Sequence, residues 1–300
     1  MNLLITGGCG FIGSNFILYQ IKNTNNNIIN FDNLTYAANE DNLKSVNNSQ
    51  RYKFIKGDIC DINHIEKLFV EFKPDAIIHF AAESHVDRSI ESPTQFVNTN
   101  ILGTANLLNI FLSYFNSLEK SNKNHFKFLH VSTDEVFGSL GKKGYFTEVT
   151  PYSPNSPYSA SKAGADHLVR SWNKTFNLPT LITNCSNNYG PYQFPEKLIP
   201  LIIANCFDKK PLPIYGDGSN IRDWLYVNDH CKAIDLILLN GKVGQSYNIG
   251  GDNEISNIEI VKTICDIMDD LKPLSGAKKY KDLITFVPDR PGHDFRYAID

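Results

Sequence analysis

Short apolar runs alternate with longer amphipathic stretches through the first half of the chain. The apolar runs predict strands at residues 3–6, 28–31, 52–56, 76–80 and 126–132, and the stretches between them have helical periodicity. Because these strands lack a polar face, helices must cover both faces of the sheet that they form. The pattern therefore predicts an α/β fold with a doubly wound parallel sheet of the Rossmann type.

The regular alternation ends near Leu181, where proline and glycine become frequent. Between short strand candidates, helices are predicted at residues 197–207, 228–239 and 257–271. We therefore expect a first domain at residues 1–183 and a smaller C-terminal α/β domain at residues 184–300, with segments of the second returning to the first. The polar stretch 116–124 predicts a helix end and a loop.

The composition is that of a globular enzyme. The chain has 300 residues, of which 42% are hydrophobic and 12% aromatic, and its formal net charge is −3. Basic and acidic residues are mixed along the chain, so no surface for nucleic acid or anionic lipid is predicted. No run reaches the ~18 apolar residues of a membrane span, and the first predicted strand leaves no room for a signal segment. We expect a cytoplasmic protein.

The cysteines indicate neither a metal site nor a disulfide framework. They are scattered, with no C-x-x-C pair and no nearby histidine at the spacing of zinc ligands. We therefore predict reduced thiols, packed in the core, for the six cysteines Cys9, Cys60, Cys185, Cys206, Cys231 and Cys265.

A glycine motif follows the first predicted strand. Gly8, Gly10 and Gly13 have the G-x-G-x-x-G spacing, which lets backbone N–H groups approach a pyrophosphate at the positive end of a helix. Asp32 ends the second strand, 19 residues after Gly13, where an acid binds the ribose hydroxyls of adenosine. Because a carboxylate repels a 2′-phosphate, the pattern favours NAD over NADP, although Asp32 alone would also suit a turn.

Tyr158 and Lys162 lie four residues apart on a predicted helix, so both side chains project from one face. A phenol acts as a base at neutral pH only when its pKa falls by roughly three units, which is about 4 kcal/mol. A lysine cation at about 4 Å offers an interaction of that size at an effective dielectric near 20, and a positively charged nicotinamide would add to it.

Thr133, Asp134 and Glu135 follow the fifth strand, at the sheet edge where the cofactor is expected. Adjacent acids at a strand end are usually solvated turn residues. In a sheltered cleft, however, neighbouring carboxyl groups raise one pKa and separate into an acid and a base. Together with Tyr158, these residues therefore indicate a reaction that uses an acid and a base beside a hydride acceptor.

These residues lie within longer motifs through which the chain resembles the dTDP-glucose 4,6-dehydratase family, a branch of the extended short-chain dehydrogenases. The resemblance runs from end to end. Besides the glycine motif, Asp32 and the residues just described, it covers Ala81 to Asp87, Cys185 to Pro191 and Asp289 to Asp294.

The resemblance implies a three-step reaction at one site, with tightly bound NAD consumed and regenerated in each turnover. Tyr158, assisted by Lys162 and Thr133, takes the 4-hydroxyl proton of the sugar as hydride leaves C4. Glu135 then removes the C5 proton, Asp134 protonates the departing C6 hydroxyl, and hydride returns to C6. The expected product is a 4-keto-6-deoxy sugar nucleotide for deoxysugar synthesis of the rhamnose type. The sequence leaves the substrate open between dTDP-glucose and UDP-glucose.

The resemblance also assigns binding residues. Those expected at the cofactor, besides Tyr158 and Lys162, are Gly7, Gly10, Phe11, Ile12, Gly13, Asp32, Asn33, Leu34, Thr35, Asp58, Ile59, Phe80, Ala81, Ala82, Ser84, Thr99 and Asn188. Those expected at the sugar nucleotide are Ser84, His85, Thr133, Asn187, Lys197, Leu198, Pro213, Ile214, Tyr215, Arg222, Asn257, Arg290 and His293. Arg222 and Arg290 suit diphosphate contacts but also structural ion pairs, and His85 suits packing as well as the site.

Two further expectations concern the assembly and the end of the chain. Relatives pair through two long helices in each subunit, which correspond here to residues 101–118 and 158–176, so a homodimer is expected. The chain ends at Asp300, where relatives usually continue with another helix, so the last part of the substrate domain is expected to be missing.

Two other functions remain open on the residues alone. A nucleotide-sugar 4-epimerase or decarboxylase shares the glycine motif and the Tyr158–Lys162 pair, but such relatives lack the Asp134–Glu135 pair. A catalytically silent NAD-binding regulator would have no use for the complete set of reactive side chains.

Overall fold

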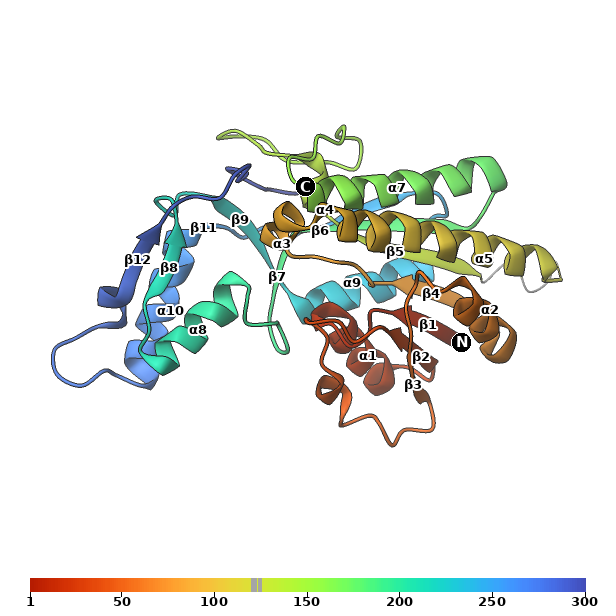
Figure 1. Ribbon diagram of the computed structural model, residues 1–300, viewed down its shortest axis with the longest axis horizontal. Coiled ribbons are helices and arrows are strands. Elements are labelled where there is room, and N and C mark those ends of the chain that lie inside the picture. The colour runs from red at the N-terminus through yellow and green to blue at the C-terminus, as the bar shows by residue number, and fades with distance from the viewer. Residues whose placement is uncertain (120–122, 124–125) are drawn as a thin grey trace.

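The computed structural model describes residues 1–119, 123 and 126–300. Seven parallel strands form its central sheet, in the order β10–β6–β5–β4–β1–β2–β3 (Figure 1). They are β1 (Asn2–Thr6), β2 (Asn27–Asp32), β3 (Tyr52–Lys56), β4 (Ala76–His79), β5 (Lys127–Thr133), β6 (Thr180–Cys185) and β10 (Ser246–Ile249). Five of these confirm the strands predicted from the apolar runs, with bounds that differ by at most one residue.

Helices cover both faces of this sheet, as the apolar character of the strands requires. On one face α1 (Phe11–Asn23) and α9 (Val227–Asn240) contribute Phe16, Ile17 and Ile234 to a buried cluster. On the other, α2 (Ile62–Phe72), α5 (Thr104–Ser117) and α7 (Pro157–Phe176) contribute Leu68, Phe111 and Val169 to a second cluster. The doubly wound α/β fold is therefore confirmed.

The connections at the sheet's carboxyl ends contain short helical segments. After β4 the chain runs through α3 (Val86–Glu91), α4 (Pro93–Phe96) and η2 (Val97–Gly103) into α5. Two single turns, η1 (Glu40–Leu43) and η3 (Asp134–Phe137), follow β2 and β5 respectively. Asp134 and Glu135 thus begin a helical turn, and the strand itself ends at Thr133.

Segments from the last part of the chain form a smaller lobe beside the central sheet (Figure 1). Its strands are β7 (Asn187–Tyr189), β9 (Ile221–Tyr226) and β11 (Glu254–Ser256) in one small sheet, and β8 (Leu212–Tyr215) with β12 (Ile284–Val287) in another. Helices α8 (Leu198–Asp208) and α10 (Asn257–Leu271) and the turn η4 (Tyr280–Leu283) enclose a third cluster that includes Ile202, Val261 and Tyr280. The three helices predicted for this region are confirmed, α9 being the one that packs on α1.

The described part of the chain has no helix that is both long and apolar enough to cross a membrane. All six cysteines are free, and five of them are buried as predicted. Cys60 is only half-buried, so the prediction of a core position was wrong for it. The prediction for residues 116–124 lies partly outside the described residues. The division of the chain at residues 183 and 184 stays a prediction, although β10 and α9 pack with the first sheet.

Candidate active site

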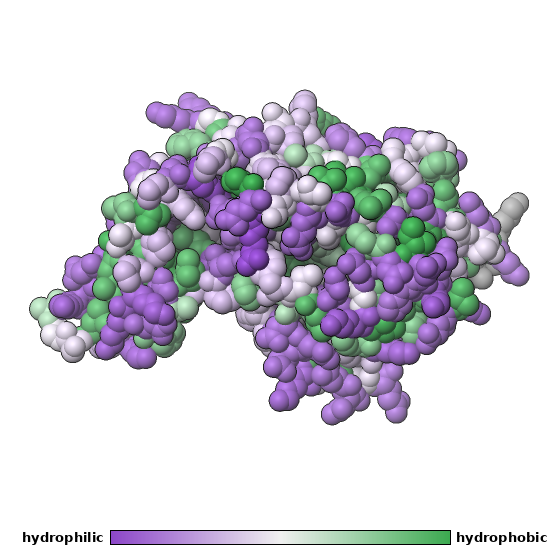
Figure 2. Space-filling view, in the orientation of Figure 1, coloured by the Kyte–Doolittle hydropathy of each residue, from purple (hydrophilic) through white to green (hydrophobic). Residues whose placement is uncertain are grey.

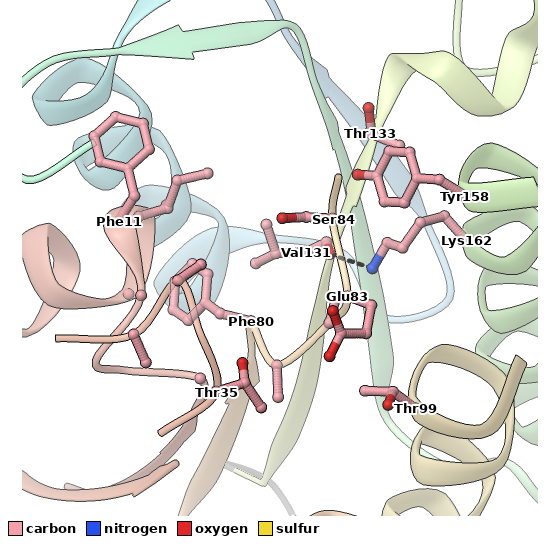
Figure 3. Close-up of a pocket in the computed structure, with 18 of the residues that line it drawn as sticks. Phe11, Thr35, Phe80, Glu83, Ser84, Thr99, Val131, Thr133, Tyr158 and Lys162 are labelled. Atoms are coloured by element: carbon pink, nitrogen blue, oxygen red, sulfur yellow. Dashed lines mark hydrogen bonds between the residues drawn. The ribbon is translucent and has the colours of Figure 1, made fainter. Parts of the chain in front are cut away.

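A cavity of about 680 Å³ lies at the carboxyl ends of the central strands. This volume is within the usual range for sites that bind small molecules and cofactors. Its walls come from the glycine loop, the ends of β2, β4 and β5, the start of α7, and the segment that leads into α8. Figure 3 shows Tyr158, Lys162 and Thr133 on one side of the cavity and Phe11 on the other.

The glycine loop has the geometry of an anion-binding helix end. Gly10 is the N-cap of α1, and no side chain in the described part of the protein caps this end. The first-turn N–H groups are therefore available to a ligand in the cavity that Gly10 to Gly13 line. Gly7 has φ of 73°, and a Cβ there would lie 2.5 Å from Ala81 N. A Cβ on Gly13 would lie 2.4 Å from Gly7 O. Side chains are therefore excluded where the backbone must come close to a phosphate.

Asp32 is held with its carboxylate at the same cavity. Its Oδ2 accepts a hydrogen bond from Cys9 N and its Oδ1 one from Leu34 N, both at 2.8 Å. Burial raises the pKa of Asp32, and the two backbone hydrogen bonds oppose that rise. The fixed carboxylate beyond the glycine loop fits a dinucleotide whose pyrophosphate lies at α1 and whose ribose lies at Asp32.

The start of α7 places Tyr158 and Lys162 in the wall of the cavity. Ser156 caps the helix through reciprocal hydrogen bonds with Ser159, and Pro157 occupies the first turn, so the helix begins immediately before Tyr158. Lys162 Nζ donates a hydrogen bond to Val131 O at 3.0 Å (Figure 3).

The Tyr158 phenol lies beside Thr133 (Figure 3). Burial, together with the charge of Glu135, raises the pKa of Tyr158 well above 10, and the Thr133 hydroxyl opposes this rise. The Lys162 ammonium group donates its hydrogen bond to Val131 O and not to the Tyr158 phenol. The protein alone therefore does not lower the pKa of Tyr158. The lowering expected from Lys162 and a bound nicotinamide stays a prediction.

The two adjacent acids have different surroundings. Asp134 is 1% exposed, and its Oδ1 accepts a hydrogen bond from Thr133 Oγ1 at 3.3 Å. Burial, followed by the charge of Glu135, raises the pKa of Asp134 well above its usual value. Burial also raises the pKa of Glu135, but the cations Arg290, Lys197 and Arg222 oppose it. Asp134 is therefore suited to carry a proton and Glu135 to accept one.

The cavity brings together most of the residues expected at the cofactor. Every one of them lines it except Leu34, whose backbone N–H holds Asp32. Of the residues expected at the sugar nucleotide, Ser84, Thr133, Asn187 and Lys197 line the cavity. The others do not: His85, Leu198, Pro213, Ile214, Tyr215, Arg222, Asn257, Arg290 and His293.

Several residues outside the lining have structural partners. Arg222 donates hydrogen bonds to the backbone carbonyls of Ile221 and Asp294 at 2.7 and 3.0 Å. Arg290 lies 3.7 Å from Asp87 Oδ1, and Tyr215 Oη donates a hydrogen bond to Asp87 Oδ2 at 3.3 Å. The charges of both arginines still act on Glu135, so they lie close enough to influence an anionic ligand.

Glu83 is a lining residue that the sequence analysis did not select. It is 5% exposed, and its Oε1 accepts a hydrogen bond from Gln95 Nε2 at 3.0 Å. The sequence did contain a signal for Glu83. It stands directly after Ala81 and Ala82, which follow a buried strand.

The fold and the cavity define the class: an extended short-chain dehydrogenase with an added acid pair. A family model described as GDP-mannose 4,6 dehydratase matches residues 4–300. A dTDP-glucose 4,6-dehydratase from Salmonella typhimurium is 54% identical over 100% of this chain and 85% of its own length. The chain belongs to the dTDP-glucose 4,6-dehydratase family.

Solved structures agree with this assignment. The crystal structure of a dTDP-glucose 4,6-dehydratase from Bacillus anthracis in complex with NAD is 48% identical, covers 100% of this chain and 87% of its own, and has a TM-score of 0.87. A UDP-glucose 4-epimerase from Thermotoga maritima superposes with a TM-score of 0.86 over 100% of this chain and 90% of its own, but at 26% identity. The two kinds of enzyme thus share the fold, and sequence separates them.

The raised pKa of Asp134 predicts a pH-dependent effect on stability. An acid whose pKa is higher in the folded than in the unfolded protein stabilises the fold below about pH 4 and loses that contribution as pH rises through the folded pKa. Asp134→Asn removes this loss. We expect the variant to gain stability over the wild type as pH rises above about 4, by about 1.4 kcal/mol for each unit of the shift.

Melting temperatures of Asp134→Asn and the wild type, measured between pH 4 and 8, test this expectation. Asp270→Asn, which changes an exposed acid on α10, is the control. Its difference in melting temperature from the wild type should not change with pH. A pH-independent difference for Asp134→Asn would contradict the raised pKa.

Proposed function

We propose that this protein is an NAD-dependent dTDP-glucose 4,6-dehydratase. The observation that carries the proposal is the acid pair beside Tyr158. Burial raises the pKa of both acids, well above the usual value at Asp134, whereas three cations oppose the rise at Glu135. Elimination of water needs one group that gives a proton and one that accepts a proton, and this difference in surroundings favours Asp134 for the first role and Glu135 for the second.

The cofactor supplies the redox chemistry. NAD, when bound, accepts hydride from C4 of the sugar and returns it to C6, so that the sugar is rearranged without net oxidation. We propose that residues 1–183 hold it, with the glycine loop at its pyrophosphate and Asp32 at the adenosine ribose. Residues 184–300 would mainly hold the sugar nucleotide.

Tyr158 is the proposed base for the sugar 4-hydroxyl. Its phenol lies beside Thr133, which can hydrogen-bond the same hydroxyl and orient it (Figure 3). Lys162, 4% exposed on the same helix face, supplies the positive charge that favours the ionised phenol. Removal of the hydroxyl proton, together with loss of the C4 hydride to NAD, would produce a C4 ketone, which acidifies the proton on C5.

Glu135 then takes the C5 proton, and Asp134 gives its proton to the departing C6 oxygen. The bond from C6 to oxygen breaks, water leaves, and a double bond forms between C5 and C6. The proton held by Glu135 returns to C5 when C6 is reduced. This sequence leaves a 4-keto-6-deoxy sugar, with Glu135 ionised as at the start, Asp134 deprotonated and the 4-hydroxyl proton on Tyr158. One proton must therefore pass from Tyr158 to Asp134, directly or through solvent, before the next turnover.

Relatives support thymine as the base, because the relatives 53–55% identical to this chain are dTDP-glucose enzymes. A 4-epimerase or decarboxylase has no role for Asp134 and Glu135. A silent NAD-binding regulator has no role for a buried, proton-bearing Asp134 beside Tyr158.

Parallel incubation with dTDP-glucose and UDP-glucose tests the substrate assignment. We expect conversion of dTDP-glucose to the 4-keto-6-deoxy product, measured by mass spectrometry as the loss of one water, with slower or no conversion of UDP-glucose. An epimer that keeps the C6 hydroxyl would overturn the dehydratase proposal. Equal turnover of both nucleotides would overturn the choice of base.

Two variants separate the oxidation step from the elimination step. Asp134→Asn lacks the proton for the leaving oxygen, so we expect it to oxidise C4 and then accumulate reduced cofactor, visible by its absorbance in a single turnover. Tyr158→Phe lacks the first base and should show no such signal, with turnover reduced at least about 10²-fold. If both variants eliminate water at the wild-type rate, the assigned roles are wrong.

We also propose that the protein forms a homodimer through α5, α7 and the segment before α5. These helices lie side by side (Figure 1), and hydrophobic side chains gather over this region in the space-filling view (Figure 2). Val97 and Leu102 on η2 are 48% and 51% exposed. Two copies could cover these side chains on a shared surface.

Light scattering at working concentration should give twice the subunit mass of 33.8 kDa. Leu102→Glu places a charge in the proposed contact and should yield single subunits. Leu271→Glu on α10, a residue that is 77% exposed, is the matched control and should stay dimeric. A wild-type mass of one subunit would contradict the dimer.

A further inference from the structure

A fully buried carboxylate lies behind Lys162, on the side away from the cavity. Asp166 is one helical turn further along α7 and is 0% exposed. None of its atoms lines the cavity. An ionised carboxylate in such a place is costly unless donors surround it, so its partners determine what it does.

Donors from several elements converge on Asp166. Its Oδ2 accepts hydrogen bonds from Ser132 Oγ and Tyr152 Oη at 2.9 Å each, and from Asn184 Nδ2 at 3.2 Å. His130 Nε2 lies 3.2 Å from its Oδ1. Burial acts to raise the pKa of Asp166, but the contact with His130, the charge of Lys162 and the hydrogen bond from Ser132 outweigh it and lower the pKa. The carboxylate is therefore ionised inside the protein.

Burial also disfavours the charged form of Lys162, which is a cation. It is 4% exposed, and its ammonium group has a hydrogen bond to Val131 O at 3.0 Å. Burial lowers the pKa of Lys162, and the charge of Asp166 is the largest influence that raises it again. Asp166 is thus the principal anion that keeps the ammonium group protonated.

His130 lies between the two charges, and its proton decides how they interact. Its Nε2 is 3.2 Å from Asp166 Oδ1 and 3.4 Å from Lys162 Nζ. Burial lowers the pKa of His130 to about 4, so the ring is neutral near pH 7. A neutral Nε2 either donates to Asp166 or accepts from Lys162, but it cannot do both.

Donation to Asp166 is the better arrangement. It gives the buried Oδ1 a partner, which no other described group supplies. It also leaves two protons of the Lys162 ammonium group free for the cavity, where Tyr158 and the cofactor are expected. The same ring atom would otherwise bind one of those protons.

We propose that Asp166 is a positioning residue for the reaction: through its negative charge and its hold on the Nε2–H of His130, it keeps Lys162 protonated and directed toward the cavity. This inference rests on the proposed function, in which Lys162 favours the ionised form of Tyr158. Loss of the Asp166 charge favours neutral Lys162, which raises the pH that Tyr158 needs in order to act as a base.

Asp166→Asn keeps the shape of the side chain and removes its charge. We expect kcat/KM for dTDP-glucose to fall at least about ten-fold at neutral pH, because the acid limb of its pH profile moves upward by about one unit or more. Tyr152→Phe is the matched control, since it removes one donor to the same carboxylate and keeps the charge. Its acid limb should stay at the wild-type pH.

If Asp166→Asn lowers the melting temperature but leaves the pH profile in place, Asp166 is only structural and the proposal is wrong. A profile that moves equally in Tyr152→Phe would also overturn it. A wild-type protein that does not dehydrate dTDP-glucose would instead refute the proposed function. The interaction of Asp166 with His130 and Lys162 would then be tested by histidine spectra alone.

Nitrogen-15 spectra of labelled histidines in the wild type provide that measurement without any change at Asp166. His130, assigned by comparison with His130→Asn, should remain neutral above about pH 5 and carry its proton on Nε2. A proton on Nδ1 would mean that Nε2 accepts from Lys162, and this result would overturn the proposal.

Discussion

The cost of burying charge is the constraint on which the site depends. Asp134, Tyr158, Lys162 and Asp166 are each less than a tenth exposed, so water does little to solvate their charged forms. Asp166 is surrounded by donors and stays ionised, whereas Asp134 has one long hydrogen bond and favours its proton. Equal burial therefore gives opposite protonation states, and the number of partners decides between them.

The parallel sheet explains how these side chains come to one place. The carboxyl ends of β1, β2, β4, β5 and β6 meet at one edge, and the strand order reverses between β1 and β4, where such folds bind dinucleotides. The C-terminal lobe then contributes Lys197, Arg222 and Arg290, whose charges act on Glu135. The difference between Asp134 and Glu135 thus needs both halves of the chain.

Much of the fold could be predicted because its signals are local. An unbroken apolar run predicts a buried strand. For that reason β1, which precedes the glycine motif, and β2, which ends at Asp32, were placed correctly. The residues around the cofactor cavity followed, since they stand at strand ends. Nine of the residues expected at the sugar nucleotide lie outside the cavity lining. Most of them belong to the C-terminal lobe, and tertiary packing, which local sequence signals do not encode, sets where that lobe lies relative to the cavity.

The sequence by itself determined the family, the doubly wound sheet and the set of reactive side chains, since motif spacing and apolar periodicity are properties of neighbouring residues. Only the tertiary structure decided how each ionisable group is charged. Asp166 and His130 gave no sequence signal, because an acid on a helix and a histidine in a strand are ordinary until their surroundings are known. Desolvation and distant partners set their protonation states, and both arise from contacts between residues far apart along the chain.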